Sequence, residues 1–281
     1  MPGFGTVVRS SLSLALLSLL SVPAFAQGDT GFLRGDGKFN LAASYSLDTY
    51  EKFWVGTDKV RDPGVGDVTR DAINLYGAYG ITDDLDVQAN ASYVRTEADG
   101  SADFDDEDDF QDAAVGVKWR FLNERLGPGG FALLAAPAVK FPMSDYENNL
   151  PTAIGDGQWD YRFRGIAHYQ FDFGLWVSIE SGYDYRSSRP DDEFPLAVTV
   201  GYTFFEHVTI SPFYTLVDSL GGYDIGEGPF PGVEEDYERL GVSAYVRITD
   251  WFGVSGAAFT TLDGRNTGDV DGFSVGTVFV F

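Results

Sequence analysis

From about residue 38 to its last residue, the chain repeats a pattern in which apolar and polar side chains alternate over a short run, and a turn then follows. In one such run, Leu85, Val87 and Ala89 alternate with Asp86 and Gln88. A period of two places successive side chains on opposite faces of a β-strand, so each run predicts a strand with one apolar and one polar face. We find no helical period after residue 26.

Twelve such runs can be counted, and the connections between them alternate in length. The runs cover about 38–50, 68–81, 85–96, 111–122, 130–142, 157–170, 174–187, 194–204, 207–217, 236–248, 251–262 and 272–281. Strands that cross a membrane at a tilt need about 9–11 residues. Short turns, as at 82–84, alternate with long loops, as at 98–110, 144–156 and 219–236. The sequence therefore predicts an all-β fold, a single closed antiparallel transmembrane β-barrel of about 12 strands.

A soluble β-sandwich would show the same alternation, because its apolar faces point inward. Three features favour the membrane. The runs exceed the usual soluble strand length of about 5–6 residues. Aromatic residues, such as Trp119 and Trp251, gather near run ends, where amphipathic rings suit the lipid–water interfaces. The last run ends on Phe281, which resembles the signal that the barrel assembly machinery reads, so we expect that machinery to be a partner.

The first 26 residues have the pattern of a secretory signal peptide. Arg9 supplies a positive charge, residues 11–22 are apolar, and Ala24 and Ala26 form a small-x-small cleavage site. The apolar stretch is shorter than the roughly 20 residues of a spanning helix. We therefore expect a signal peptide at 1–26, a barrel at 27–281, and a location in the outer membrane of a Gram-negative cell.

Composition narrows the possible functions. The net charge is −24, so phosphate would repel the chain and nucleic-acid binding is not expected. Cysteine is absent, which excludes thiol chemistry and cysteine metal sites. We expect no cofactor and no bound structural metal.

Charged residues on the polar faces of the runs are the candidate functional residues. On the lipid side an Arg or Lys near the midplane would cost about 2–4 kcal/mol, so these side chains are expected to point into the lumen. The residues expected to set selectivity there are Lys118, Arg120, Lys140, Arg162, Arg164, Glu180, Asp184, Arg186, Arg239 and Arg247. Such a lumen is either a water-filled channel or a sealed interior whose charges pair. The excess of cations favours a lumen that attracts anions.

Acidic residues concentrate in the long loops. The densest run contains Asp103, Asp105, Asp106, Glu107, Asp108 and Asp109. Asp191, Asp192 and Glu193, and also Glu234, Glu235 and Asp236, form smaller clusters. The simple interpretation is a solvated surface. The alternative is weak binding of divalent cations beside the lipopolysaccharide of the outer leaflet, because carboxylates suit calcium.

Catalysis is the least supported function. The chain has two histidines, His168 and His207. Outer-membrane phospholipases carry a His, a Ser two residues later and a more distant Asn, but Gln170 and Thr209 occupy the Ser positions here. No Gly-x-Ser-x-Gly elbow is present. We therefore assign no catalytic residue and interpret His168 as a polar residue lining the lumen.

Three segments resemble an outer-membrane family of proposed transporters of the meta-pathway of phenol degradation. They are Gly-Val-Gly-Asp-Val at 64–68, Val-Gly-Val-Lys-Trp-Arg-Phe-Leu-Asn-Glu at 115–124, and Ala-Val-Lys-Phe-Pro-Met-Ser at 138–144 with Gly-Asp-Gly at 155–157. The resemblance implies a barrel with an uptake role for hydrophobic or aromatic compounds, and it supplies no binding residues.

The leading hypothesis is a passive outer-membrane channel or transporter for small solutes with a charged, basic-leaning lumen. The second is a closed structural or surface-interaction barrel that acts through its acidic loops. The third, an outer-membrane lipid hydrolase, has the least support. Conductance separates the first two hypotheses, and lipid hydrolysis would be needed for the third.

Overall fold

The computed structural model describes residues 28–61, 65–100, 106–148, 150, 152–189, 191–228 and 232–281. The signal peptide expected at 1–26 lies outside the described residues. No helix in these ranges is long and apolar enough to cross a membrane.

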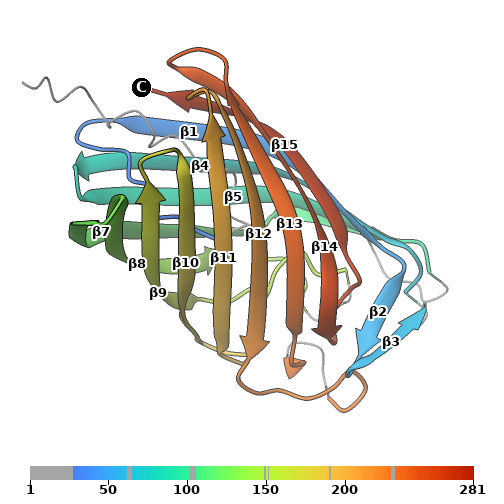
Figure 1. Cartoon of the computed structure of the whole chain (residues 1–281). Coiled ribbons are helices and arrows are strands. Elements are labelled where there is room, and N and C mark those ends of the chain that lie inside the picture. Colours follow the sequence, from blue (N-terminus) through green and yellow to red (C-terminus); the bar gives the residue numbers. More distant parts are fainter. Residues whose placement is uncertain are drawn as a thin grey trace, which may run out of the picture.

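Twelve long antiparallel strands form one closed barrel (Figure 1). They are β1 (Phe39–Tyr50), β4 (Val68–Thr82), β5 (Leu85–Ala98), β7 (Asp112–Leu126), β8 (Gly129–Pro142), β9 (Asp160–Phe171), β10 (Leu175–Arg186), β11 (Glu193–Phe204), β12 (Val208–Ser219), β13 (Asp236–Arg247), β14 (Phe252–Arg265) and β15 (Asp271–Val280). Each strand pairs with its neighbours along the chain, and β1 closes the barrel by pairing with β15, where Leu41 faces Phe279. The predicted fold class is confirmed.

In the described part of the chain, three short strands lie at the long-loop end, and the sequence did not predict them. β2 (Lys52–Val55) and β3 (Asp58–Arg61) form a hairpin beyond β1. This hairpin docks on the β14–β15 loop, where the Trp54 amide donates to the Thr267 carbonyl at 2.8 Å. β6 (Glu107–Phe110) pairs with the end of β5. Their alternation is too short to stand out from the loops in the sequence.

The barrel is apolar outside and polar inside. On the outer wall, Ile73 and Phe163 are 57% and 58% exposed. Inside, Asn40, Lys118 and Thr199 are almost fully buried. A soluble sandwich would show the reverse arrangement, so this distribution supports the membrane barrel over the soluble alternative.

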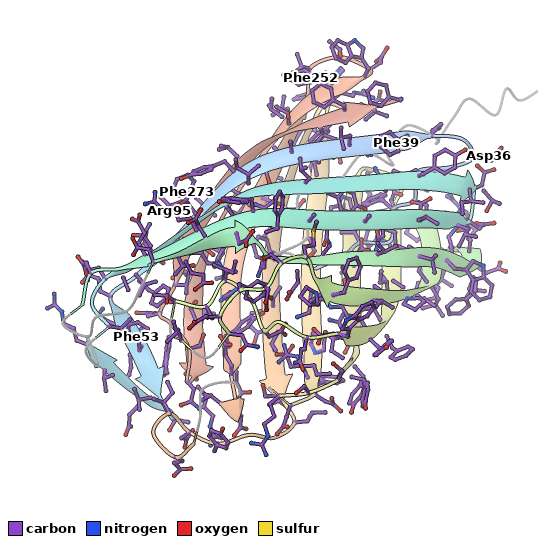
Figure 2. All side chains as sticks on the ribbon, turned by 180° about the vertical axis from the view of Figure 1, so that it is seen from behind. Asp36, Phe39, Phe53, Arg95, Phe252 and Phe273 are labelled. Carbon is purple, nitrogen blue, oxygen red and sulfur yellow. The ribbon has the colours of Figure 1, made fainter. Side chains whose placement is uncertain are left out.

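Aromatic rings gather at both ends of the barrel, as the sequence predicted. At the short-turn end, the rings of Trp251 and Phe279 stack at 6.3 Å. At the long-loop end, Phe141 packs on Trp159 at 5.4 Å. Figure 2 shows Phe252 near the short-turn end, opposite the Phe53 hairpin. Two belts of rings suit the two lipid–water interfaces.

Candidate functional site: the barrel lumen

The N-terminal segment 28–34 runs through the lumen before β1 begins. Its polar anchor is Asp29, whose carboxylate accepts a hydrogen bond from Lys118 Nζ at 2.9 Å. The same Lys118 ammonium donates to the Thr30 carbonyl at 3.1 Å, and the Asp29 amide donates to the Glu180 carboxylate. Lys118 has a side chain only 2% exposed, so this segment supplies the partners that its buried charge requires.

The apolar part of the segment packs against one side of the lumen wall. The Phe32 ring meets the His168 and Trp176 rings edge-on, with centroids 4.7 and 5.1 Å apart. Leu33 joins a small cluster with Leu134 and Ile166. The fit includes Gly31, where an added Cβ would lie 2.2 Å from His168 Cβ, so only glycine fits this approach.

Where the segment leaves the lumen, near the short-turn end, Arg34 forms an ionic contact with Asp86. The Arg34 amide donates to Asp86 Oδ2 at 2.8 Å, and the Arg34 guanidinium lies 3.8 Å from the same carboxylate. Both side chains are buried. Residues 28–34 therefore occupy the middle of the barrel and divide its interior.

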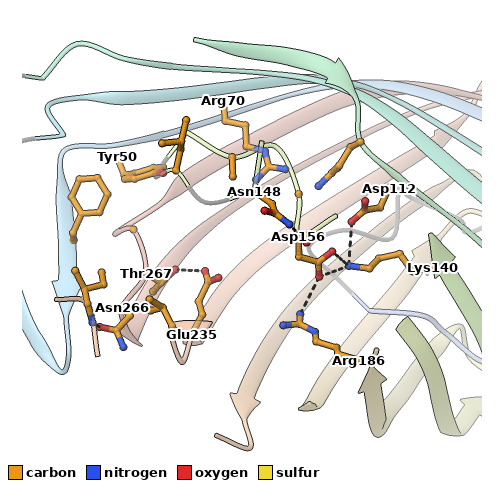
Figure 3. A pocket seen from close by; sticks show the side chains of 18 of the residues that line it. Tyr50, Arg70, Asp112, Lys140, Asn148, Asp156, Arg186, Glu235, Asn266 and Thr267 are labelled. Carbon is orange, nitrogen blue, oxygen red and sulfur yellow. Dashed lines mark hydrogen bonds and ion pairs between the residues drawn. The ribbon is translucent and has the colours of Figure 1, made fainter. Parts of the chain in front are cut away.

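The upper cavity, of about 410 Å³, lies on the long-loop side of this segment. Figure 3 shows Arg70, Asp112, Lys140, Asp156 and Arg186 around it. Lys140 lies between three carboxylates, at 3.2 Å from Asp112, 2.5 Å from Asp156 and 2.6 Å from Asp160.

Asp156 reaches the cavity from the loop between β8 and β9. Burial by itself raises the pKa of this carboxyl, but the cations Lys140 and Arg186 outweigh burial and hold the pKa below its usual range. A loop residue thus completes the charge balance of the lumen wall.

The lower cavity, also about 410 Å³, opens beside the short turns. Arg120, Asn123, His168 and Gln170 line it, together with residues 31–35 of the N-terminal segment. Arg120 forms an ion pair with Asp84 at 2.7 Å, so it belongs to the rim of the barrel.

The structure places the remaining predicted residues in pairs with carboxylates or rings. Arg164 contacts Glu180 at 3.2 Å and also holds Asp184. Arg186 contacts Glu193 at 2.5 Å. Arg239 packs over the ring of Tyr237, with its guanidinium carbon 4.0 Å from the ring centroid.

Arg162 and Arg247 complete the predicted set. Arg162 lines the upper cavity, 3.8 Å from Asp184. Arg247 is buried, and its backbone amide donates to the His207 carbonyl at 2.8 Å. All ten predicted residues belong to barrel strands, and their role in selectivity stays a prediction.

Sequence reasoning missed the partners that come from outside the strands. Asp29 and Asp156 lie in irregular segments with no alternation to mark their direction. Two residues of the acidic clusters that the sequence analysis placed in loops also face inward. Glu193, the first residue of β11, pairs with Arg186, and Glu235 lines the upper cavity. Carboxylates therefore neutralise the cations of the lumen more fully than the excess of basic residues on the strands indicated. The short apolar pair Phe32 and Leu33, just before the first run, was the one available signal of the inserted segment.

Among the described residues, a His–Ser contact lies inside the lumen. His168 Nδ1 is 2.6 Å from Ser178 Oγ, and both residues are buried beside Phe32. His168 Nε2 has no hydrogen-bond partner among the described residues, so no carboxylate there orients the ring as in a triad. His168 thus lines the lumen, as the sequence indicated. Within the described ranges, no group of three His, Asp or Glu residues could hold a metal ion; Asp103 and Asp105 lie outside them.

These features define an outer-membrane β-barrel with an apolar belt, a polar lumen and an inserted N-terminal segment. Residues 23–275 match the family model described as "Putative MetA-pathway of phenol degradation", and the chain belongs to that family. The resemblance seen in the short segments is thereby confirmed. No curated protein sequence matches the chain.

Three solved structures with a similar fold are an outer membrane channel, a porin and the translocator domain of an autotransporter. The COG4313 outer membrane channel from Pseudomonas putida F1 is 14% identical, with a TM-score of 0.75 over 93% of this chain and 100% of that chain. The NanC porin is 11% identical, with a TM-score of 0.52 over 86% of this chain and 98% of that one. The translocator domain of the autotransporter NalP from Neisseria meningitidis is 11% identical, with a TM-score of 0.50 over 87% of this chain and 88% of that one.

Proposed function

We propose that this protein is a passive outer-membrane channel for small solutes, with no catalytic role. The observation that carries the proposal is the division of the lumen. A cavity of about 410 Å³ lies at each end, and the segment 28–34 lies between them, with residues 31–34 lining the lower cavity and Asp29 bound to Lys118. A barrel of purely structural function has no need of such cavities, because side chains can fill a narrow lumen, as in barrels of about eight strands.

The contacts that hold segment 28–34 in the lumen are of a kind that allows the segment to be displaced. Several of its anchors are polar, such as Lys118 with Asp29 and Asp86 with Arg34. Water can replace polar contacts of this kind when the segment moves. Solutes would then pass from the upper cavity to the lower one along the charged wall of β7, β9 and β10.

The proposed channel prefers anions only weakly. Carboxylates from the N-terminal segment, from the β8–β9 loop and from the first residue of β11 neutralise Lys118, Lys140 and Arg186. The remaining cationic surplus lies at the upper cavity, around Arg70 and Arg162. We expect a small shift of the reversal potential toward the anion value in a salt gradient.

Single-channel recording tests the proposal. The refolded barrel is compared with a variant that lacks residues 28–34, both in planar bilayers. The proposal expects stable openings from the full barrel and a larger conductance from the deletion variant. A deletion variant that folds, shown by its heat-modifiable mobility, but stays silent would overturn the channel.

The second candidate is the closed barrel that acts through its loops. The packing of Phe32 and Leu33 favours it, because the apolar anchor resists displacement. Silent bilayers with both proteins would support this candidate. The family model and the similar channel and porin folds support the first candidate.

A further inference from the structure

The upper cavity contains both charged and apolar walls at one end of the lumen. Four cationic side chains line it, Arg70, Lys140, Arg162 and Arg186, and three carboxylates, Asp112, Asp156 and Glu235. Counting these groups alone would suggest a nearly neutral site. The hydrogen bonds of each group decide which of them remains available to a ligand.

The three carboxylates all have partners within the protein. Asp112 and Asp156 share the Lys140 ammonium, and Asp156 also lies 3.8 Å from Arg186. Glu235 accepts a hydrogen bond from the Thr267 hydroxyl at 2.8 Å. Lys140 and Arg186 are in turn occupied by these acids, so neither cation is available to bind an additional anion.

Arg70 keeps most of its donors available. Its Nη2 donates to the Ile154 carbonyl at 2.8 Å, which holds the guanidinium against the β8–β9 loop. Among the described residues, Arg70 forms no ion pair with a carboxylate, although Asp48 is near enough to interact with its charge. A guanidinium has five N–H donors, so one carbonyl leaves several unused.

Arg162 is also incompletely paired. Its contact with Asp184 is long, at 3.8 Å, and Arg164 Nη2 holds the same carboxylate at 2.6 Å. Within the described part of the chain, the buried Arg162 Nε has no hydrogen-bond partner. This Nε is sealed from the cavity, but the Arg162 side chain is 31% exposed and lines the cavity, so its Nη groups are the donors that remain for a ligand.

The opposite wall of the cavity is apolar. The rings of Tyr50 and Phe53 meet edge-on at 4.9 Å, and Ile225 and Val233 continue the surface. Phe53 belongs to the β2–β3 hairpin, which places its ring in the lining of the cavity. Apolar walls with a few directed polar groups are typical of small-molecule sites.

We propose that the upper cavity is a binding site for small carboxylates with an apolar body. Arg70 and Arg162 hold the carboxylate, since a guanidinium matches its two oxygens, and Tyr50, Phe53, Ile225 and Val233 cover the apolar body. As the entry site of a solute, this assignment rests on the proposed channel function. Binding itself requires only the folded barrel, so the two proposals can fail separately.

Calorimetry with four probes of graded chemistry tests the site. The full barrel in lipid nanodiscs is titrated with cyclohexanecarboxylate, with its neutral analogue cyclohexylmethanol, with the cation cyclohexylmethylamine, and with acetate. Empty nanodiscs provide the blank. Only cyclohexanecarboxylate combines a negative charge with the apolar body. We therefore expect it to bind at least tenfold more tightly than the other three probes, as charge-assisted hydrogen bonds allow.

Variants separate the cationic wall from general effects of charge. Arg162→Gln leaves Asp184 held by Arg164, so the fold is preserved, and we expect about tenfold weaker binding. Arg70→Gln should weaken binding similarly. The matched control is Arg125→Gln at the short-turn end, whose ion pair with Asp172 is exposed and whose loss should leave binding unchanged.

A second pair of variants tests the apolar wall. Phe53→Ala should weaken the binding of cyclohexanecarboxylate and leave the binding of acetate unchanged. Phe173→Ala, in an exposed turn, should change the binding of neither probe. Equal affinities for the acid and the alcohol would overturn the site, and so would unchanged affinity in both arginine variants. Conductance recorded on the same samples keeps the proposals distinct: a silent barrel that binds the acid rejects only the channel, and a conducting barrel that does not bind it rejects only the site.

Discussion

Replacing Asp29 by Asn should release the segment that divides the lumen. Lys118 is 2% exposed, and Asp29 is its one carboxylate partner within 4 Å among the described residues. At an effective dielectric constant of about 20, unit charges at this separation of 2.9 Å attract by about 6 kcal/mol. Removing one partner of a buried pair costs about 3–5 kcal/mol, because the other charge stays desolvated.

That cost falls on the docked state alone, because water can solvate Lys118 once the segment leaves. The ratio of docked to released segment should therefore fall by about 10²–10⁴-fold, at 1.4 kcal/mol for each tenfold step. Single-channel recording of the refolded variant should show longer or larger openings. Proteolysis should also cleave residues 28–34 faster in the variant than in the parent barrel.

Two further variants decide whether the ion pair is the cause. Asp36→Asn changes an exposed acid in the adjacent turn and should behave like the parent. Adding Lys118→Met to Asp29→Asn removes the unpaired buried charge, so docking should recover in part. Parental conductance and parental protease resistance in Asp29→Asn would refute the reasoning, and a double variant as open as the single one would show that the pair does not hold the segment.

Three other changes test the barrel wall, the loops and assembly. Ile73→Arg places a cation on the lipid face of β4 and should lower the free energy of unfolding by about 2–4 kcal/mol in denaturant titrations in lipid; a loss below 0.5 kcal/mol would contradict the outward direction of this side chain. The loop residue Asp224 has a pKa below its usual range because Arg265 and Asn266 donate hydrogen bonds to it. A lowered pKa stabilises the folded loop above the unfolded value of about 4, and this contribution is lost as the pH falls through the lower folded value. Hydrogen exchange of the loop 220–228 should accelerate in that acidic range, and Asp224→Asn should remove the dependence on pH. Phe281→Ser should reduce the amount of assembled barrel in cells while refolding in detergent stays normal, and Phe252→Ser should leave assembly unchanged; equal assembly of both would reject the terminal signal.

The strands were predictable because alternation is a local property of the sequence. The predicted run at 85–96 became β5 at Leu85–Ala98, and the other runs agree within a few residues. The inward direction of Lys140 followed from the same rule. The hairpin of β2 and β3 did not, because four residues are too few for an alternation to be recognised.

The sequence by itself determined the barrel, its apolar belt and the candidate charges of its lumen, since each strand carries its own two-faced pattern. Only the tertiary structure decided how those charges pair. Lys118 meets Asp29 across 89 positions of sequence, and Lys140 meets Asp156 from a loop without periodicity. Such partners are fixed by barrel closure and by the path of the N-terminal segment, which no local pattern encodes. The available donors of Arg70 and Arg162 become visible only when the ion pairs of Lys140, Arg164 and Arg186 are known.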